Sequence, residues 1–166
     1  MAHAHSLPPT TRALSHAPGL VKISDPILRR LLRNGVPLWP NQVVVMRGRT
    51  SGKAYEVPLA IMEFRSRRFV MGTFGEVNWV RNLRAAGEAE IQVAGKAPEL
   101  VRAVELAGED AVAFYRDTFA AYTLAMSGLM RLFARIFLGL FAPEMLSDPR
   151  IAAAKHPVFE LLRSTG

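Results

Sequence analysis

Short apolar runs joined by tight polar turns constrain the fold of this chain more than any other feature. One run lies at residues 43–46, a second at 57–64 and a third at 69–73, and the polar turn 65–67 joins the second to the third. Runs of this length with such short joints predict β-strands that pair as hairpins.

The same pattern returns later in the chain. Runs at 89–93 and 99–106 flank a turn around Gly95 and Lys96, which predicts a further hairpin. A last run at 156–162 predicts a strand that closes the fold. Short hairpin-joined strands favour a small barrel over a doubly wound sheet, so we expect a mainly β, α+β fold.

Helices are expected between and after these strands. Asn78 is a capping residue type, and we expect it to cap a helix that runs through Ala86 and ends at Gly87. Beyond Gly108 the chain turns helical, with segments at 109–122 and 127–141.

The segment 127–141 is almost entirely apolar. Only Arg131 and Arg135 interrupt it, and it is shorter than the roughly 20 residues that a membrane span needs. We expect a buried core or lid helix, with a membrane-surface or dimer contact as the alternative.

The N-terminal segment differs from the rest in composition. Residues 1–20 are expected to form a flexible arm, and 21–166 a single cofactor-binding domain. The residues after Asp25 predict a short amphipathic helix over 26–32.

Composition bounds the chemistry. The chain has no cysteine, which excludes disulfides, thiolate metal sites and a cysteine nucleophile. No signal peptide is visible, and a cytoplasmic location is expected, with a possible association with the inner membrane surface. The formal charge of +7 favours anionic partners.

Two segments are candidates for binding an anion. The turn Arg47–Lys53 combines two glycines with three cations and two hydroxyls, which suits a phosphate, although an ordinary solvated turn has the same composition. The segment Thr73–Leu83 runs from a strand end into a helix start, where free N–H groups attract anions. Its Trp79 either stacks on a ring or packs in the core.

Familiar catalytic arrangements are absent. The sequence contains no Gly-x-Ser-x-Gly elbow, and three of its four histidines lie within the first 16 residues. We therefore expect no metal site or histidine triad, and chemistry carried by a cofactor instead.

Three stretches of the sequence carry a resemblance to a known family. They are Arg47-Gly48-Arg49-Thr50-Ser51-Gly52-Lys53, Val57–Leu59 and Phe74–Gly87, and together they resemble the deazaflavin-dependent nitroreductase family. The resemblance covers roughly residues 40 to 107, and the closing His156–Phe159 is also typical. It implies an FMN-binding-like split β-barrel that holds coenzyme F420, a deazaflavin with a phosphate and a polyglutamate tail. The reduced coenzyme then delivers a hydride to a quinone, a nitroaromatic or an activated alkene.

The resemblance and the two candidate segments together give the expected cofactor-binding residues. They are Arg47, Arg49, Thr50, Ser51, Lys53, Tyr55, Val57, Pro58, Met71, Thr73, Phe74, Gly75, Asn78, Trp79, Val80 and Arg81. Tyr115 and Tyr122 are the candidates for a substrate-side hydroxyl, and the proton comes from a tyrosine or from water.

The sequence departs from the family pattern at several of these positions. Thr50 stands where a second basic residue is usual, Ala54 replaces a proline, Tyr55 replaces an arginine, and Phe74 stands where some members have lysine. Lost cations weaken phosphate binding, since each charge-assisted hydrogen bond contributes roughly 1.5–3 kcal/mol. Arg47 and Lys53 are the residues that could compensate.

Other functions stay open at this point. The apolar run and the missing cations also suit a non-catalytic barrel that carries a lipid-like or other apolar ligand. FMN is a less favoured cofactor. Nucleic-acid binding is not expected, because the arginines are scattered and no aromatic residues are interleaved with them. The expected partner is a small-molecule acceptor, and a peripheral membrane contact and a second copy of the chain are open alternatives.

Overall fold

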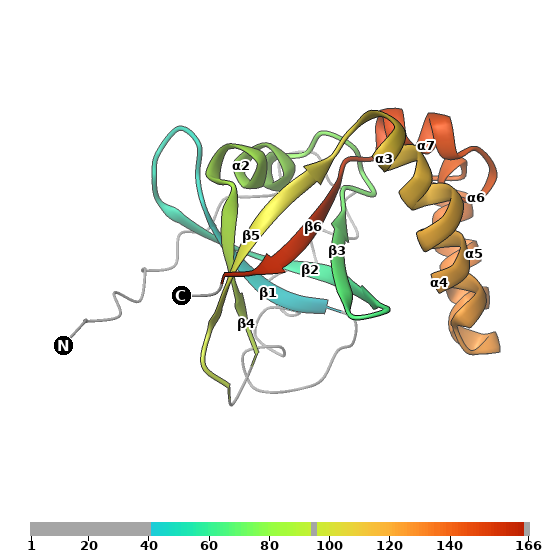
Figure 1. The fold of residues 1–166 in the computed structure, drawn as a ribbon, viewed down its shortest axis with the longest axis horizontal. Coiled ribbons are helices and arrows are strands. Elements are labelled where there is room, and N and C mark those ends of the chain that lie inside the picture. The colour runs from blue at the N-terminus through green and yellow to red at the C-terminus, as the bar shows by residue number, and fades with distance from the viewer. Residues whose placement is uncertain (1–40, 94–95, 165–166) are drawn as a thin grey trace. The chain divides into compact units, whose positions relative to one another are not determined.

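The computed structural model describes residues 41–93 and 96–164. In these ranges the strands are β1 (Asn41–Arg47), β2 (Ala54–Phe64), β3 (Arg67–Met71), β4 (Glu88–Gln92), β5 (Glu99–Leu106) and β6 (Val158–Arg163). They close into a barrel in the order β1-β2-β3-β6-β5-β4 (Figure 1). The predicted barrel, its hairpins and its closing strand are confirmed.

The described chain separates into two compact units, each built from segments that are distant in sequence. The first contains residues 41–61, 77–103 and 162–164, apart from the undescribed 94–95. The second contains Met62–Glu76 and Val104–Leu161.

The first unit is built around β1. This strand pairs antiparallel with β2 and with β4, so that Val44 lies opposite both Val57 and Ile91. All three side chains are almost fully buried. β-branched residues suit such a position because their stiff side chains pack well on a pleated surface.

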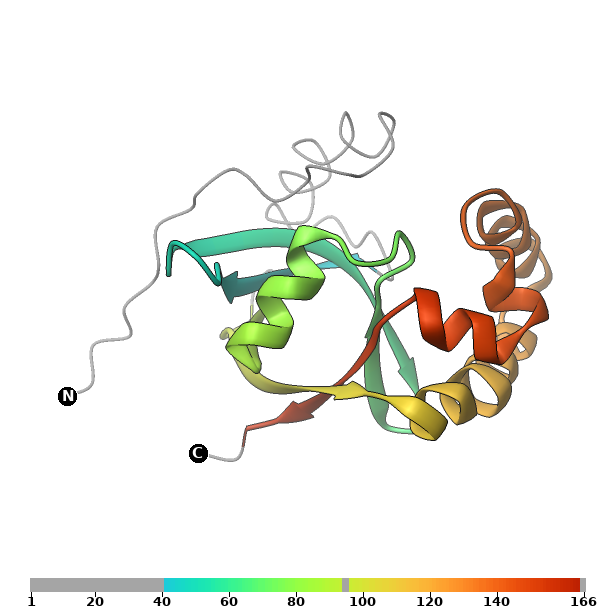
Figure 2. The same ribbon diagram turned by 90° about the horizontal axis from the view of Figure 1, so that it is seen from above.

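Helix α2 (Asn78–Ala86) packs against β1 and β4 in this unit (Figure 2). It buries Trp79, Val80 and Leu83, whose spacing places them on one helical face. Gly87 ends the helix in the left-handed conformation with φ of 68°. The prediction that Asn78 is the cap is wrong: Val77 has the extended backbone of the N-cap position, and Asn78 is the first helical residue.

The second unit pairs β3 with β6 and carries the later helices. Its helical elements are α3 (Gly108–Ala113), the π-helical segment η1 (Phe114–Phe119), α4 (Ala120–Ala125), α5 (Gly128–Phe141), α6 (Glu144–Ser147) and α7 (Pro149–Lys155). Phe69 of β3 is fully buried and packs on Phe114 of η1, with ring centroids 4.9 Å apart. Asp148 caps α7 by accepting hydrogen bonds from the N–H groups of Arg150 and Ile151.

Helix α5 corrects one expectation. Its limits agree with the predicted 127–141 segment, but it is not a buried core helix. Within α5, every residue of which the structure describes, Leu138 alone is buried. Its other large apolar side chains are exposed. None of the described helices is long and apolar enough to cross a membrane. The predicted arm 1–20 and helix 26–32 lie outside the described residues.

Candidate functional site

The turn that leaves β1 is closed by its own backbone. Gly48 N–H donates to the carbonyl of Lys53 at 2.8 Å, and Gly52 N–H donates to the carbonyl of Gly48 at 2.8 Å. Gly52 has a φ of 64°, a conformation that glycine adopts at little cost. A side chain at Gly48 would collide with the ring of Tyr55, so the position needs glycine.

Most N–H groups of this turn are already used. Besides those of the two glycines, the N–H of Lys53 donates to Ser51 Oγ at 3.3 Å, and the N–H of Arg49 donates to Asn82. Four N–H groups of the turn therefore have partners within the protein.

The polar side chains of the turn are accessible to a ligand. Arg47, Arg49 and Lys53 are all exposed, and so are Thr50 and Ser51. Ser51 Oγ lies 3.3 Å from the hydroxyl of Tyr55, within hydrogen-bonding distance. Tyr55 stands where the nitroreductase family that the sequence resembles has a second arginine, and it contributes a hydroxyl to the same turn instead of a charge.

Arg49 ties the turn to helix α2. Its backbone N–H and its guanidinium Nη1 both donate to Oδ1 of Asn82, at 3.3 and 3.0 Å. Asn82 is buried, with 5% of its surface exposed, so the acceptor is fixed in the packed face of the helix. A guanidinium has five N–H donors, and this contact leaves others for a ligand.

Asn82 was not among the expected site residues, although a signal for it exists. It lies between Trp79 and Leu83 on the buried face of an amphipathic helix. A polar residue on such a face needs a hydrogen-bond partner, because an unpaired buried amide is costly. The sequence could not indicate that this partner comes from a turn 33 residues earlier.

The expected residues of α2 divide into two groups. Trp79 and Val80 are buried, with 5% and 0% of their surfaces exposed, which agrees with core packing. Arg81 is exposed and Asn78 is partly exposed in the first turn of the helix. Of the expected β2 residues, Val57 is buried, while Pro58 is partly exposed and lies opposite Val43 of β1.

The remaining expected residues lie in the second unit, in or just after β3. The N–H of Thr73 donates to the carbonyl of Met71 at 3.0 Å, and that of Gly75 donates to Gly72 at 2.7 Å. These amides are satisfied within the loop. Phe74 packs edge-on against Phe137 of α5, with ring centroids 6.2 Å apart.

The two candidate tyrosines have different surroundings. Tyr115 is 2% exposed, and its hydroxyl donates to the carbonyl of His156 at 2.7 Å. Burial raises the pKa of Tyr115 far above its usual range. Tyr122 is partly buried beside Phe64, and burial raises its pKa as well. Tyr115 has the environment of a structural hydroxyl, and Tyr122 is the more accessible candidate.

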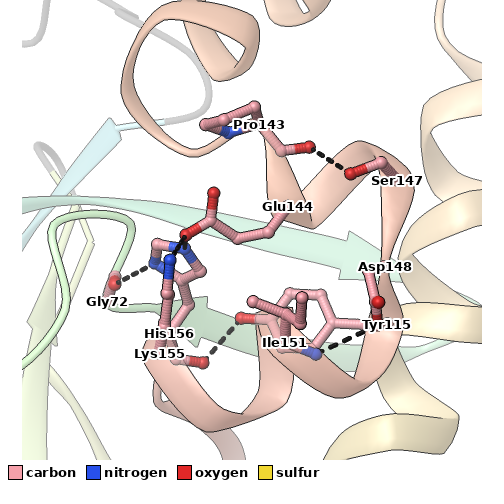
Figure 3. Close-up of polar contacts among 9 residues, drawn as sticks. All are labelled: Gly72, Tyr115, Pro143, Glu144, Ser147, Asp148, Ile151, Lys155 and His156. Atoms are coloured by element: carbon pink, nitrogen blue, oxygen red, sulfur yellow. Dashed lines mark hydrogen bonds and ion pairs between the residues drawn. The ribbon is translucent and has the colours of Figure 1, made fainter.

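A polar cluster that sequence reasoning missed lies around His156 (Figure 3). The buried imidazole places Nε2 3.3 Å from Glu144 Oε1 and Nδ1 3.3 Å from the carbonyl of Gly72. Lys155 Nζ lies 3.0 Å from the same carboxylate oxygen. The pKa of Glu144 is lowered to about 2 by the hydrogen bond from its own backbone N–H and by Lys155 and His156.

The second unit also contains a cavity of about 410 Å³ that includes none of the expected site residues. It is lined by Arg67, Phe69, Leu106, Asp110, Ala113, Phe114, Asp117, Thr118 and Glu160. Arg67 and Glu160 form a bidentate ion pair, with Nε 2.7 Å from Oε1 and Nη2 2.8 Å from Oε2. No cluster of three or more metal-ligating side chains occurs among residues 41–93 and 96–164.

Comparison with known proteins identifies similar folds. No family model matches the sequence, and no curated protein matches it. An FMN-binding protein from Nostoc punctiforme PCC 73102, related to pyridoxamine 5'-phosphate oxidase, is 13% identical with a TM-score of 0.49, and the match covers 90% of this chain and 82% of that one. An F420-H2 dependent reductase is 19% identical with a TM-score of 0.44, covering 74% and 94%.

A third similar structure is that of HutZ, a heme storage protein from Vibrio cholerae. It is 12% identical with a TM-score of 0.47, and the match covers 85% of this chain and 90% of that one. At identities this low the likeness concerns the fold alone.

Proposed function

We propose that this protein is an oxidoreductase that transfers a hydride from reduced coenzyme F420 to a quinone, a nitroaromatic or an activated alkene. The observation that carries the proposal is the junction of Arg49 with Asn82. This contact holds a cationic side chain in place before any ligand arrives, and preorganisation of that kind improves affinity by reducing the entropy lost on binding.

The residues of the turn fit the anionic part of this coenzyme. Three exposed cations, Arg47, Arg49 and Lys53, lie within seven residues of one another. Thr50 and Ser51 add hydroxyl donors beside them. Phosphate oxygens accept such charge-assisted hydrogen bonds well, and arginine suits them because its planar fork bonds two oxygens at once.

The chain's own residues would bind and orient the coenzyme, while the deazaflavin, when bound, supplies the hydride. Arg49 holds the phosphate, and Asn82 is a positioning residue because it acts through Arg49. Tyr122 is the proposed source of the proton that follows the hydride, with water as the alternative. The sequence resemblance is the basis for two further roles. It implies that Phe74 lies beside the deazaflavin ring, and Asn78 to Arg81 at the lower part of the coenzyme.

Binding is tested by titrating the purified full-length protein with F420 and following the fluorescence of the coenzyme. We expect saturable quenching with the parent protein. Absence of binding up to high micromolar coenzyme would reject the proposal. A parallel titration with FMN separates the two flavins: a yellow purified protein that binds FMN more tightly than F420 would contradict the choice of coenzyme.

The carrier alternative is tested on the same preparation by native mass spectrometry. A protein that holds F420 and no apolar ligand agrees with the proposed oxidoreductase. A protein that co-purifies with a stoichiometric lipid-like ligand and does not bind F420 is a carrier.

A further inference from the structure

Helix α5 presents an entirely apolar outer face. Eight large apolar side chains of this helix are exposed, among them Leu140 at 72% and Phe133 at 61%. The full set is Leu129, Met130, Leu132, Phe133, Ile136, Phe137, Leu140 and Phe141. They recur at spacings of three and four residues, which places them on one side of the helix. We call this surface the α5 face.

The two charged residues of α5, Arg131 and the exposed Arg135, are four residues apart and therefore share the other side of the helix. The guanidinium Nη2 of Arg131 donates to the carbonyls of Leu124 and Met126, at 2.7 and 2.9 Å. Arg131 therefore faces the α4–α5 corner, on the same side as the buried Leu138. A surface helix of a monomeric protein normally shows the reverse arrangement, with its polar side toward water.

We propose that the α5 face is the interface through which two copies of this chain form a symmetric dimer. The exposed apolar area of the α5 face is large enough for such an interface. Eight side chains that each expose on the order of 100 Å² of apolar surface provide roughly 800 Å² per partner, which is what a stable protein interface needs. A straight helix of 14 residues is about 21 Å long, so two copies can pair side by side across a two-fold axis.

Composition and charge favour a second copy over a lipid surface. The face is rich in Phe, Leu and Met and has no charged residue, as is typical of the core of a homodimer interface. The segment that carries it, residues 104–161, has seven acidic and five basic side chains. The positive charge that would attract anionic lipid therefore lies elsewhere in the chain.

The oligomeric state of the full chain tests this inference, and analytical ultracentrifugation at micromolar concentration measures it. We expect the parent protein to sediment as a dimer and the double variant Phe133→Glu/Leu140→Glu to sediment as a monomer with an unchanged circular dichroism spectrum. Ala154→Glu, which adds the same charge at an exposed position of α7, is the matched control and should remain dimeric. A monomeric parent, or a double variant that stays dimeric, overturns the proposal.

A second variant keeps the test decisive if the charged variant does not fold. Because the chain has no cysteine, Ile136→Cys introduces one thiol near the middle of the α5 face. Under mild oxidation it should form a disulfide-linked dimer in high yield, whereas Ala154→Cys should not. Equal, low yields from both variants contradict the interface.

Other occupants of the face give different results. If residues 1–40 of the same chain cover it, the parent is a monomer and the charged variant melts at a lower temperature. If lipid covers it, the parent is a monomer that co-sediments with phosphatidylglycerol vesicles. Either result overturns the dimer. The test needs no coenzyme, so it is independent of the proposed hydride transfer.

Discussion

At the scale of single residues, the proposed anion site in the turn after β1 depends on Arg49 and Asn82. We expect Arg49→Ala to weaken F420 binding roughly ten- to a hundredfold, because a charge-assisted hydrogen bond contributes roughly 1.5–3 kcal/mol. Asn82→Ala should also weaken binding, since the guanidinium loses its fixed acceptor. Titration of each variant with the coenzyme measures both effects.

The double variant shows whether the two residues act together. If Asn82 acts through Arg49, then Asn82→Ala should have little further effect on affinity once Arg49 is alanine. Arg102→Ala, which removes an exposed arginine from β5, serves as the control and should bind like the parent. Additive losses from Arg49 and Asn82 would contradict the positioning role of Asn82.

The lowered pKa of Glu144 predicts how the stability of the folded protein depends on pH. Its pKa is about 2 in the folded protein and 4.5 ordinarily, so the folded state favours the charged form. The resulting stabilisation is complete above about pH 4.5 and is lost as the pH falls toward 2. Thermal unfolding from pH 7 to pH 3 should therefore show a smaller acid-induced drop in Tm for Glu144→Gln than for the parent. Parallel curves for the two proteins would contradict this role.

Contacts between single residues were the part of the site that the sequence predicted least well. The sequence predicts the basic turn and the segment Thr73–Leu83, which includes the start of α2, as candidate halves of a site. The contact between the turn and α2 depends on the buried amide of Asn82, which no local pattern reveals. No local pattern indicates a polar cluster around His156. Its partners, Glu144 and the carbonyl of Gly72, are 12 and 84 residues away in sequence, and only the fold brings them together.

At the scale of elements, the position of Tyr115 in the π-helical segment η1 indicates a structural role for this residue. Its hydroxyl is committed to the carbonyl of His156, so we expect Tyr115→Phe to lower the free energy of unfolding by about 1 kcal/mol and to leave the rate of hydride transfer unchanged. Tyr122→Phe should slow formation of the protonated product, the step after hydride transfer, if Tyr122 supplies the proton. Urea denaturation and single-turnover kinetics on both variants separate the two effects. A slower reaction in Tyr115→Phe at full stability would restore Tyr115 as a catalytic residue.

The strands were predictable because their signal is local. Apolar runs and tight turns specify hairpins over a few residues, and the limits of β1, β4, β5 and α2 lie within three residues of the expected ones. Burial of α5 was not predictable in this way. An apolar helix has the same sequence pattern whether it packs in the core of its own protein or against another molecule. In the structure, most of the apolar surface of α5 is exposed.

At the scale of the whole molecule, charge and apolar surface are separated along the chain. The excess of basic residues lies outside residues 104–161, and the turn proposed to bind an anion lies outside them too. The exposed apolar helix lies inside that segment. This separation suits a protein that binds an anionic coenzyme through one set of elements and a second copy through another.

Hydride transfer itself is the central claim, and isotope labelling of the coenzyme tests it most directly. Reduced F420 with deuterium at the ring carbon that donates the hydride is mixed with the full-length protein and, in turn, a soluble quinone, a nitroaromatic and an activated alkene. A reduced alkene should retain the deuterium on carbon, which mass spectrometry detects. Deuterium delivered to a quinone oxygen or to a nitro group exchanges with water, so for these acceptors the measurement is single-turnover oxidation of the coenzyme, which should be slower with deuterium than with hydrogen. With Arg49→Ala at the same coenzyme concentration, the reaction should be much weaker. If the protein binds the reduced coenzyme and no acceptor of the three classes oxidises it, the protein is not the proposed oxidoreductase.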